Sequence, residues 1–213
     1  KNMAQVSEYL TAEGSFALEM DEKRSRFIAV VTHVESMADV NDFLDKLKKS
    51  NKDAKHVCYG YCLGADSMTA KNNDDGEPAG SAGAPISDAL AKIKLTDTLV
   101  AVVRYYGGIQ LGKSKLSRMY FNVAFEALKQ CKKARMVDCA IYAMTLKYPD
   151  FVPVGTYLRD NKLPIISAEY GDVVSLRVAL PSYDTDRHIS EIKTRMSEEF
   201  MFSKIDSEFF KMD

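Results

Sequence analysis

Two short segments carry the residue types that could bind or transform an anion. The first, residues 74–85, combines three acidic residues with three glycines just before a predicted helix. Glycine permits backbone conformations that other residues resist, and successive free amides at a helix N-terminus attract anions. The segment therefore predicts a binding loop. A long exposed loop, whose acidic residues favour the helix dipole, explains the same composition.

The second segment, residues 103–120, concentrates cations and tyrosines: Arg104, Tyr105, Tyr106, Lys113, Lys115, Arg118 and Tyr120. Basic groups contact phosphates and tyrosine rings stack on bases, so this composition is typical of an RNA-binding edge. The alternative is that Tyr120 packs in the core and that the lysines are merely solvated.

Residues 107–114 also match the Gly-x-x-x-x-Gly-Lys-Ser pattern of phosphate-binding loops, and they lie between a predicted strand and a predicted helix. A nucleotide hydrolase of that kind continues with a parallel sheet and supplies an acid for magnesium from a later strand. The rest of this chain predicts one helix and a βαββαβ unit instead. We therefore expect no hydrolysis of ATP or GTP.

The composition sets the class of protein. The chain has 213 residues, of which 46% are hydrophobic and 28% charged, as in an ordinary folded protein. Its net charge of -1 means that any nucleic-acid site is a local patch, and we expect no sequence-specific reading of DNA. The four cysteines form no CxxC pair and there are only three histidines, so we expect reduced thiols, no metal and no cofactor. No apolar run reaches the length of a membrane span or a signal peptide, which predicts a cytoplasmic protein.

The positions of apolar residues predict an N-terminal α/β domain of two layers, helices against a sheet. The predicted strands are residues 15–20, 26–34, 56–64 and 98–106, and the predicted helices are residues 37–49, 86–95 and 114–130. Ser36 can cap the first helix. Residues 66–85 are polar and rich in turn-forming residues, so we expect a long loop there.

A lysine-rich turn at residues 132–135 is expected to end this domain, after which the order of elements changes. Strand 139–147, helix 151–160, strands 164–170 and 173–180, helix 185–199 and strand 203–210 form a βαββαβ series. That series is the ferredoxin-like unit. The predicted fold class is therefore α+β, with domains at residues 1–137 and 138–213.

Residues 75–86 and 104–112, with Leu116, Arg118 and Tyr120 following, resemble the signature of the Impact/YigZ family. Residues 25–28 and His56 also fall where that family has similar residues. The resemblance covers about residues 15–135, and it implies an N-terminal domain like the second domain of ribosomal protein S5. The weaker C-terminal part is similar to the second domain of the bacterial members, which is like the last domain of elongation factor G. Ser114 and Lys115 stand where the family commonly has two glycines, and this departure creates the match to a phosphate-binding loop.

The resemblance implies a role in translation, because eukaryotic members of the family regulate translation by binding a ribosome-associated activator of a stress kinase. The leading hypothesis is a non-catalytic protein that binds RNA or a ribosome-associated protein. The alternative is a hydrolase or phosphotransferase on the same face, with Asp75, Glu77, His56 and Arg104 as an acid/base site. The predicted binding residues are Asp75, Gly76, Glu77, Pro78, Gly80, Ser81, Gly83, Arg104, Tyr105, Gly107, Gly108, Lys113, Lys115, Arg118 and His56.

One short helix links the two segments, so a crossover should return the chain to the same sheet and bring them to one edge. We therefore expect Glu77 or Asp75 to pair with Arg104 or Arg118. If Arg104 serves binding alone, its replacement by alanine should abolish partner binding and leave the melting temperature nearly unchanged.

Overall fold

The computed structural model describes residues 6–197 and 201–212, which form two compact units. One unit comprises Tyr9–Ala134; the other begins at Arg135, includes the rest of the described chain, and also takes in residues 6–8. The division falls three residues before the expected boundary, and the independent folding of the two domains stays a prediction. No helix in the described residues combines the length and apolar character that a membrane crossing requires.

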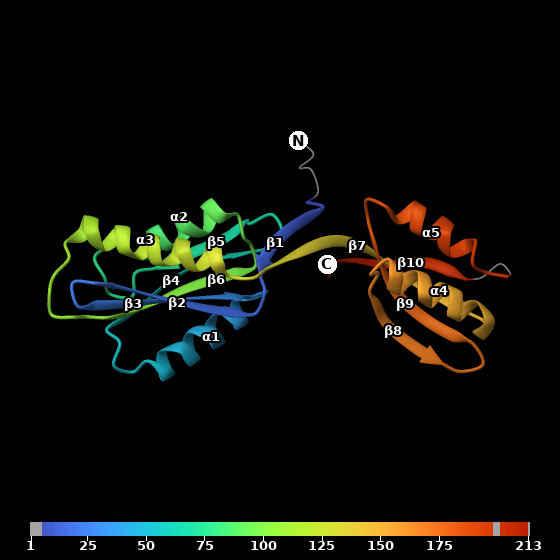
Figure 1. The fold of residues 1–213 in the computed structure, drawn as a ribbon, viewed down its shortest axis with the longest axis horizontal. Coiled ribbons are helices and arrows are strands. Elements are labelled where there is room, and N and C mark those ends of the chain that lie inside the picture. The colour runs from blue at the N-terminus through green and yellow to red at the C-terminus, as the bar shows by residue number, and fades with distance from the viewer. Residues whose placement is uncertain (1–5, 198–200, 213) are drawn as a thin grey trace. The chain divides into compact units, whose positions relative to one another are not determined.

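The first unit is built on an antiparallel sheet (Figure 1). Its strands follow the order β2 (Ser15–Glu22), β3 (Ser25–His33), β6 (Thr98–Tyr105), β4 (His56–Leu63) and β5 (Thr69–Asn73). The central strand β6 is apolar and buried along almost its whole length. A strand with no exposed face requires cover on both sides of the sheet.

Helices supply that cover on both faces (Figure 1). On one face, α2 (Gly83–Ile93) and α3 (Lys113–Gln130) pack against alternate residues of β6, including Val100 and Val102. On the other face, α1 (Met37–Ser50) packs against the intervening residues. Ser36 caps α1 as predicted, since its hydroxyl oxygen accepts a hydrogen bond from the backbone amide of Asp39 at 3.2 Å. The unit therefore has three layers, one more than the sequence predicts.

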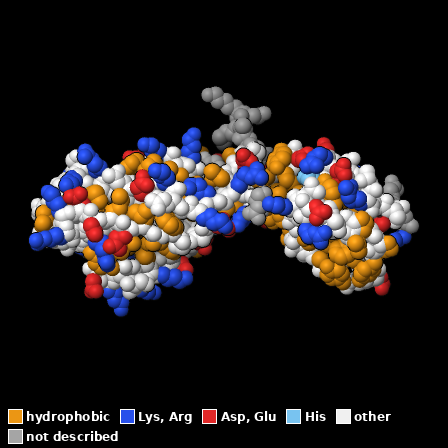
Figure 2. Space-filling model, viewed as in Figure 1, with side chains coloured by type: hydrophobic (Ala, Val, Ile, Leu, Met, Phe, Trp, Pro, Cys, Tyr) orange, Lys and Arg blue, Asp and Glu red, His pale blue; other side chains and the backbone are white. Residues whose placement is uncertain are grey.

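The second unit is an antiparallel sheet with two helices between its strands, the predicted βαββαβ series. The chain order is β7 (Lys133–Leu146), α4 (Tyr148–Asp160), β8 (Ile165–Tyr170), β9 (Val174–Pro181), α5 (Thr185–Lys193) and β10 (Phe202–Met212). The strands lie in the order β10, β7, β9, β8, as the ferredoxin-like series requires. Hydrophobic side chains gather at one edge of this unit, over β8 and its turn to β9 (orange in Figure 2).

Several boundaries differ from those predicted. The expected turn at residues 132–135 is wrong, because Lys133 and Arg135 belong to the long strand β7. The helix predicted over 185–199 ends at Lys193, and residues 198–200 lie outside the described residues. Two strands were not predicted: β1 (Glu8–Ala12), which pairs with β7, and β5, which interrupts the predicted loop.

The register of the strands determines which side chains lie next to Arg104. On the sheet, Arg104 at the end of β6 lies opposite Phe27 of β3 on one side and His56 of β4 on the other. Residues paired across strands point to the same face of a sheet. Arg104, Phe27 and His56 therefore share the face that α2 and α3 cover.

Candidate anion-binding site

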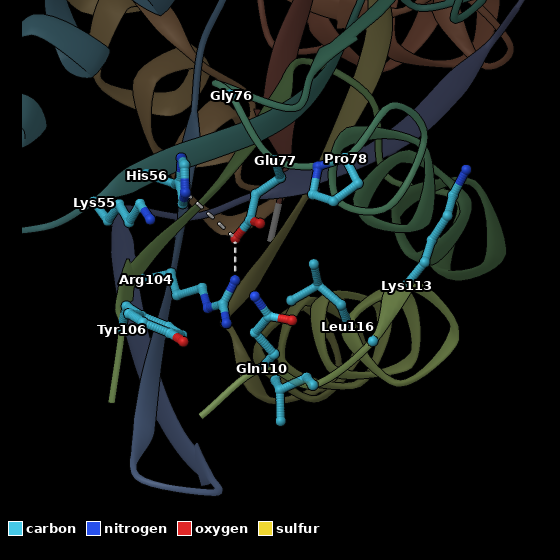
Figure 3. A pocket seen from close by; sticks show the side chains of 12 residues that line it. Lys55, His56, Gly76, Glu77, Pro78, Arg104, Tyr106, Gln110, Lys113 and Leu116 are labelled. Carbon is cyan, nitrogen blue, oxygen red and sulfur yellow. Dashed lines mark hydrogen bonds and ion pairs between the residues drawn. The ribbon is translucent and has the colours of Figure 1, made fainter. Parts of the chain in front are cut away.

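The two segments meet in a buried ion pair. Arg104 Nη1 lies 2.5 Å from Glu77 Oε1, and the two side chains are only 7% and 4% exposed (Figure 3). The expectation that Glu77 or Asp75 pairs with Arg104 or Arg118 is thus confirmed for Glu77 and Arg104. The pair connects the loop before α2 with the end of β6.

A short chain of hydrogen bonds extends from this pair into the core. Tyr120 of α3 donates its hydroxyl to Glu77 Oε1 at 2.8 Å, and Cys58 of β4 donates its thiol to the Tyr120 oxygen at 3.4 Å. Burial raises the pKa of Tyr120 far above its ordinary value and that of Cys58 to about 12. Both groups therefore stay protonated and act as donors at neutral pH.

His56 faces the pair with a fixed tautomer. Its Nδ1 lies 2.7 Å from the backbone carbonyl of Asp75, and a carbonyl only accepts, so Nδ1 carries a proton. Its Nε2 lies 4.0 Å from Glu77 Oε1. The ring thus turns Nε2 toward the same space as Arg104 (Figure 3).

Asp75 has a structural connection of its own. Its carboxylate accepts the amide of Val57 at 2.7 Å and pairs with Lys48 of α1 at 2.9 Å. Burial works to raise the pKa of Asp75, but the Val57 amide and Lys48 outweigh it and hold the pKa below its usual value. Asp75 therefore fastens the loop to β4 and α1 rather than contacting Arg104.

The N-terminus of α2 is occupied by the chain's own carboxylate. Asp74 accepts the amides of Gly80, Ala82 and Gly83 at 2.8–2.9 Å. The prediction that free amides at this helix end attract an external anion is therefore wrong. Burial works to raise the pKa of Asp74, but these three amides, with Lys113 nearby, lower it overall.

Replacing Asp74 with alanine is expected to lower the free energy of unfolding by about 0.5–2 kcal/mol, as for other lost helix caps. The folded-state pKa lies below the ordinary 3.8, so this contribution is complete above pH 3.8 and is lost as the pH falls further, through the folded pKa. Urea unfolding followed by circular dichroism, at neutral pH and at steps below 3.8, measures both effects. Asp88→Ala, an exposed acid on the same helix, is the control. Equal losses in the two variants at neutral pH would contradict the cap.

The guanidinium of Arg104 is stacked between aromatic rings. Its Cζ lies 5.3 Å from the centroid of Phe27 and 5.5 Å from that of Tyr106, and Lys55 Nζ lies 5.2 Å from the Tyr106 centroid. Among the described residues, Glu77 is the one hydrogen-bond partner of this guanidinium, and its Nε is buried without any. The arginine is thus fixed in position, and its other N–H groups have no hydrogen-bond partner among the described residues.

A pocket of about 590 Å³ opens over this guanidinium (Figure 3). It is lined by Lys55, His56, Gly76, Glu77, Pro78, Arg104, Tyr106, Gln110, Leu111, Gly112, Lys113 and Leu116. Lys55, Arg104 and Lys113 line it together with the single carboxylate of Glu77, and the Lys113 side chain extends away from Arg104 (Figure 3). No side chain in the described part of the chain caps the first turn of α3, whose first residue, Lys113, lines the pocket. The first amides of a helix lack intrahelical partners and carry its positive dipole end, so the pocket suits an anion.

A second hollow of about 640 Å³ continues along α3 and shares Leu111, Gly112 and Lys113 with the first. It adds Lys115, which pairs with Glu22 at 2.6 Å, and Arg118. We call the two hollows together the α3 groove. No group of three or more His, Cys, Asp or Glu side chains in the described residues is placed to hold a metal ion.

The structure divides the predicted site residues into two sets. Those that line the α3 groove are His56, Gly76, Glu77, Pro78, Arg104, Lys113, Lys115 and Arg118. Those outside it are Asp75, Gly80, Ser81, Gly83, Tyr105, Gly107 and Gly108. Several of these hold the fold together: Tyr105 donates its hydroxyl to Asn51 at 2.7 Å, and Gly83 lies against the backbone of Asn73.

Sequence reasoning missed Lys55 and Gln110, and it left Tyr106 out of the predicted site. Lys55 precedes β4 and has no motif around it. The position of His56 could have indicated Lys55. A residue that directly precedes a site residue at the end of a strand lies at the same edge of the sheet. Tyr106 follows Tyr105, which is the last residue of β6. Which of the two rings faces the pocket depends on where the strand ends.

The match to a phosphate-binding loop is limited to the sequence pattern of residues 107–114 and does not extend to the surrounding sheet. Residues 107–114 do link a strand to a helix, but β6 is paired antiparallel on both sides. A nucleotide hydrolase of that class builds its loop into a parallel sheet, so the surrounding fold differs. The absence of hydrolysis stays a prediction.

Comparisons with known proteins agree with the resemblance. Residues 23–128 match the model of the Impact N-terminal domain. The chain is 34% identical to the IMPACT family member YigZ of Escherichia coli, over 75% of this chain and 79% of that protein. It is 31% identical to an IMPACT family member of Haemophilus influenzae, over 90% and 94% of the two chains. A solved structure described as a hypothetical protein has 28% identity and a TM-score of 0.65, covering 94% of this chain and 98% of its own. The chain therefore belongs to the IMPACT family.

Proposed function

We propose that this chain is a non-catalytic RNA-binding protein that acts in translation and holds a single strand along the α3 groove. The observation that carries the proposal is the line of cations that runs from Lys55 through Arg104 and Lys113 to Arg118. The link to translation comes from the role of eukaryotic members of the family.

The charge is local, as a nucleic-acid site on a nearly neutral protein requires. The whole chain has a net charge of -1, yet Lys113 and Arg118 are both exposed on the first two turns of α3. Acidic residues would normally favour such a helix start, and its first turn contains none. Cations placed against the helix dipole lower stability slightly and favour a bound anion.

An aromatic ring stands beside the cations. Tyr106 is 41% exposed at the rim of the pocket, with Lys55 and Arg104 both near its ring. Stacking of a base on such a ring stabilises binding by about 1–3 kcal/mol and tolerates any sequence. Cations for phosphates and a ring for a base together favour single-stranded RNA over a protein partner.

The enzyme alternative has weaker support. Glu77 is one of the two acids of the predicted acid/base site, and its Oε1 already accepts hydrogen bonds from Arg104 and Tyr120. Both donors belong to the protein itself, so this oxygen is already engaged within the fold. The arrangement favours binding over catalysis.

Binding of a fluorescent RNA of roughly 12 nucleotides, followed by anisotropy across a salt series, tests the proposal. Lys113→Ala and Arg118→Ala are each expected to weaken binding and to reduce the slope of log K against log salt by about 0.7, the value for one phosphate contact on a single strand. Lys129→Ala is the matched control, because it removes an exposed lysine from the last turn of the same helix.

An unchanged slope in both variants would place the RNA elsewhere on the protein. Absence of RNA binding, with capture of a ribosome-associated protein from nuclease-treated lysate, would replace RNA by a protein partner.

A further inference from the structure

The end of the α3 groove at Arg104 differs from the rest of it. Lys113 and Arg118 are exposed, so a phosphate within a strand can reach them from the side. Arg104 is 7% exposed, lies at the base of the pocket, and has one hydrogen-bond partner among the described residues. A ligand group reaches it only by entering the pocket.

The donors around Arg104 converge on one small volume. Its outer guanidinium nitrogen faces the space between Tyr106 and Gln110, and His56 turns Nε2 toward the same pocket (Figure 3). Lys55 and Lys113 line opposite parts of the wall, and the uncapped start of α3 lies beside Lys113. A planar guanidinium with free N–H groups binds two oxygens of one phosphate at once.

We propose that this pocket binds a terminal phosphomonoester of RNA, so that the protein recognises a phosphorylated RNA end. This inference rests on the proposed RNA-binding function. It names which part of the RNA enters the pocket over Arg104.

The shape of the ligand decides between an end and an internal position. An internal phosphate is joined to a ribose on both sides, and the second ribose blocks its approach to a nearly buried guanidinium. A terminal phosphate has one substituent and three free oxygens, so it can enter the pocket head first.

The charge of the pocket also favours a terminal phosphate over an internal one. A terminal phosphate carries a charge of about -1.5 to -2 at neutral pH, against -1 for an internal one. Glu77 offsets Arg104, with which it pairs, and Asp74 lies near enough to Lys113 to offset part of that lysine's charge. Lys55 and the rest of the Lys113 charge are left for the ligand, and they attract a doubly charged group more strongly than a singly charged one.

The test compares three forms of one RNA oligonucleotide: with a 5′-phosphate, with a 3′-phosphate and with hydroxyl groups at both ends. One of the phosphorylated forms is expected to bind at least about tenfold more tightly than the hydroxyl form, the size of one charge-assisted hydrogen bond. Which form binds more tightly identifies the end.

Two variants assign the preference to the pocket. Arg104→Lys keeps the charge that pairs with Glu77 but loses the two-pronged donor, so it should weaken the binding of the phosphorylated form more than that of the hydroxyl form. Lys55→Ala, a change at an exposed residue, should act in the same direction without affecting folding. Lys113→Ala should weaken the binding of all three forms.

Equal affinity for the three forms would overturn the end-binding inference and leave the proposed function intact. A preference that both Arg104→Lys and Lys55→Ala retain would also overturn it, because the end would then bind elsewhere. Failure of every form to bind would overturn the proposed function, and the inference with it.

Discussion

Arg104→Ala is expected to lower the free energy of unfolding by about 3–5 kcal/mol, the range for removal of one partner from a buried ion pair. The substitution leaves the Glu77 carboxylate, which is 4% exposed, with Tyr120 as its remaining donor. It also removes the group that packs between Phe27 and Tyr106. Urea unfolding followed by far-ultraviolet circular dichroism measures the loss, since the chain has no tryptophan to report by fluorescence.

Arg118→Ala is the control, because this exposed arginine lines the same groove without a buried partner. Its effect should stay within about 0.5 kcal/mol, as for most surface changes. The sequence-based expectation that Arg104→Ala leaves the melting temperature nearly unchanged assumed an exposed residue. If Arg104→Ala costs no more than Arg118→Ala, the buried pair contributes nothing to stability.

Gly107→Ala is expected to destabilise the protein by about 1–3 kcal/mol, the usual range for overpacking. A Cβ at this position would lie 2.1 Å from the backbone carbon and oxygen of Arg24, in the turn between β2 and β3. Backbone atoms cannot rotate away as a side chain can, so the turn itself must move. The hydrogen bond from the Gly107 amide to Ser25 Oγ, at 3.2 Å, would be disturbed with it.

Gly108→Ala is the matched control for this clash. No atom of the described residues lies within 4 Å of a Cβ there, so the positive φ of 82° is what opposes the change. Its cost should be that of the left-handed backbone alone, about 1–2 kcal/mol. The same urea experiment compares both variants. A smaller loss for Gly107→Ala than for Gly108→Ala would show that the turn moves freely.

The sequence predicts the elements whose residues show a regular pattern. The spacing in α1 and α3 is a strong signal because burial repeats with the period of a helix, and the unbroken apolar run of β6 is typical of a strand covered on both faces. Strand β5 has no such signal, since its residues are mostly polar and all exposed. It forms because its backbone pairs with β4, which no local pattern reveals.

The candidate site was predictable where topology alone brings residues together. The crossover through α2 places Glu77 near Arg104, and the structure shows that pair. The cap on α2 was not predictable. The sequence does not show whether the amides at the start of this helix bind an external anion or, as the structure has it, the carboxylate of Asp74. Which of several acids in a loop turns inward depends on backbone angles, such as the positive φ of 43° at Asp75.

The thiol of Cys58 makes the inner wall of the site resistant to oxidation. The thiolate is the form that oxidants attack, and a pKa of about 12 leaves on the order of one thiol in 10⁵ ionised at neutral pH. Cys58, Cys62, Cys131 and Cys139 are all buried and unpaired. Oxidation of Cys58 is therefore expected to be slow, so that the thiol keeps its hydrogen bond to Tyr120, which in turn donates to Glu77.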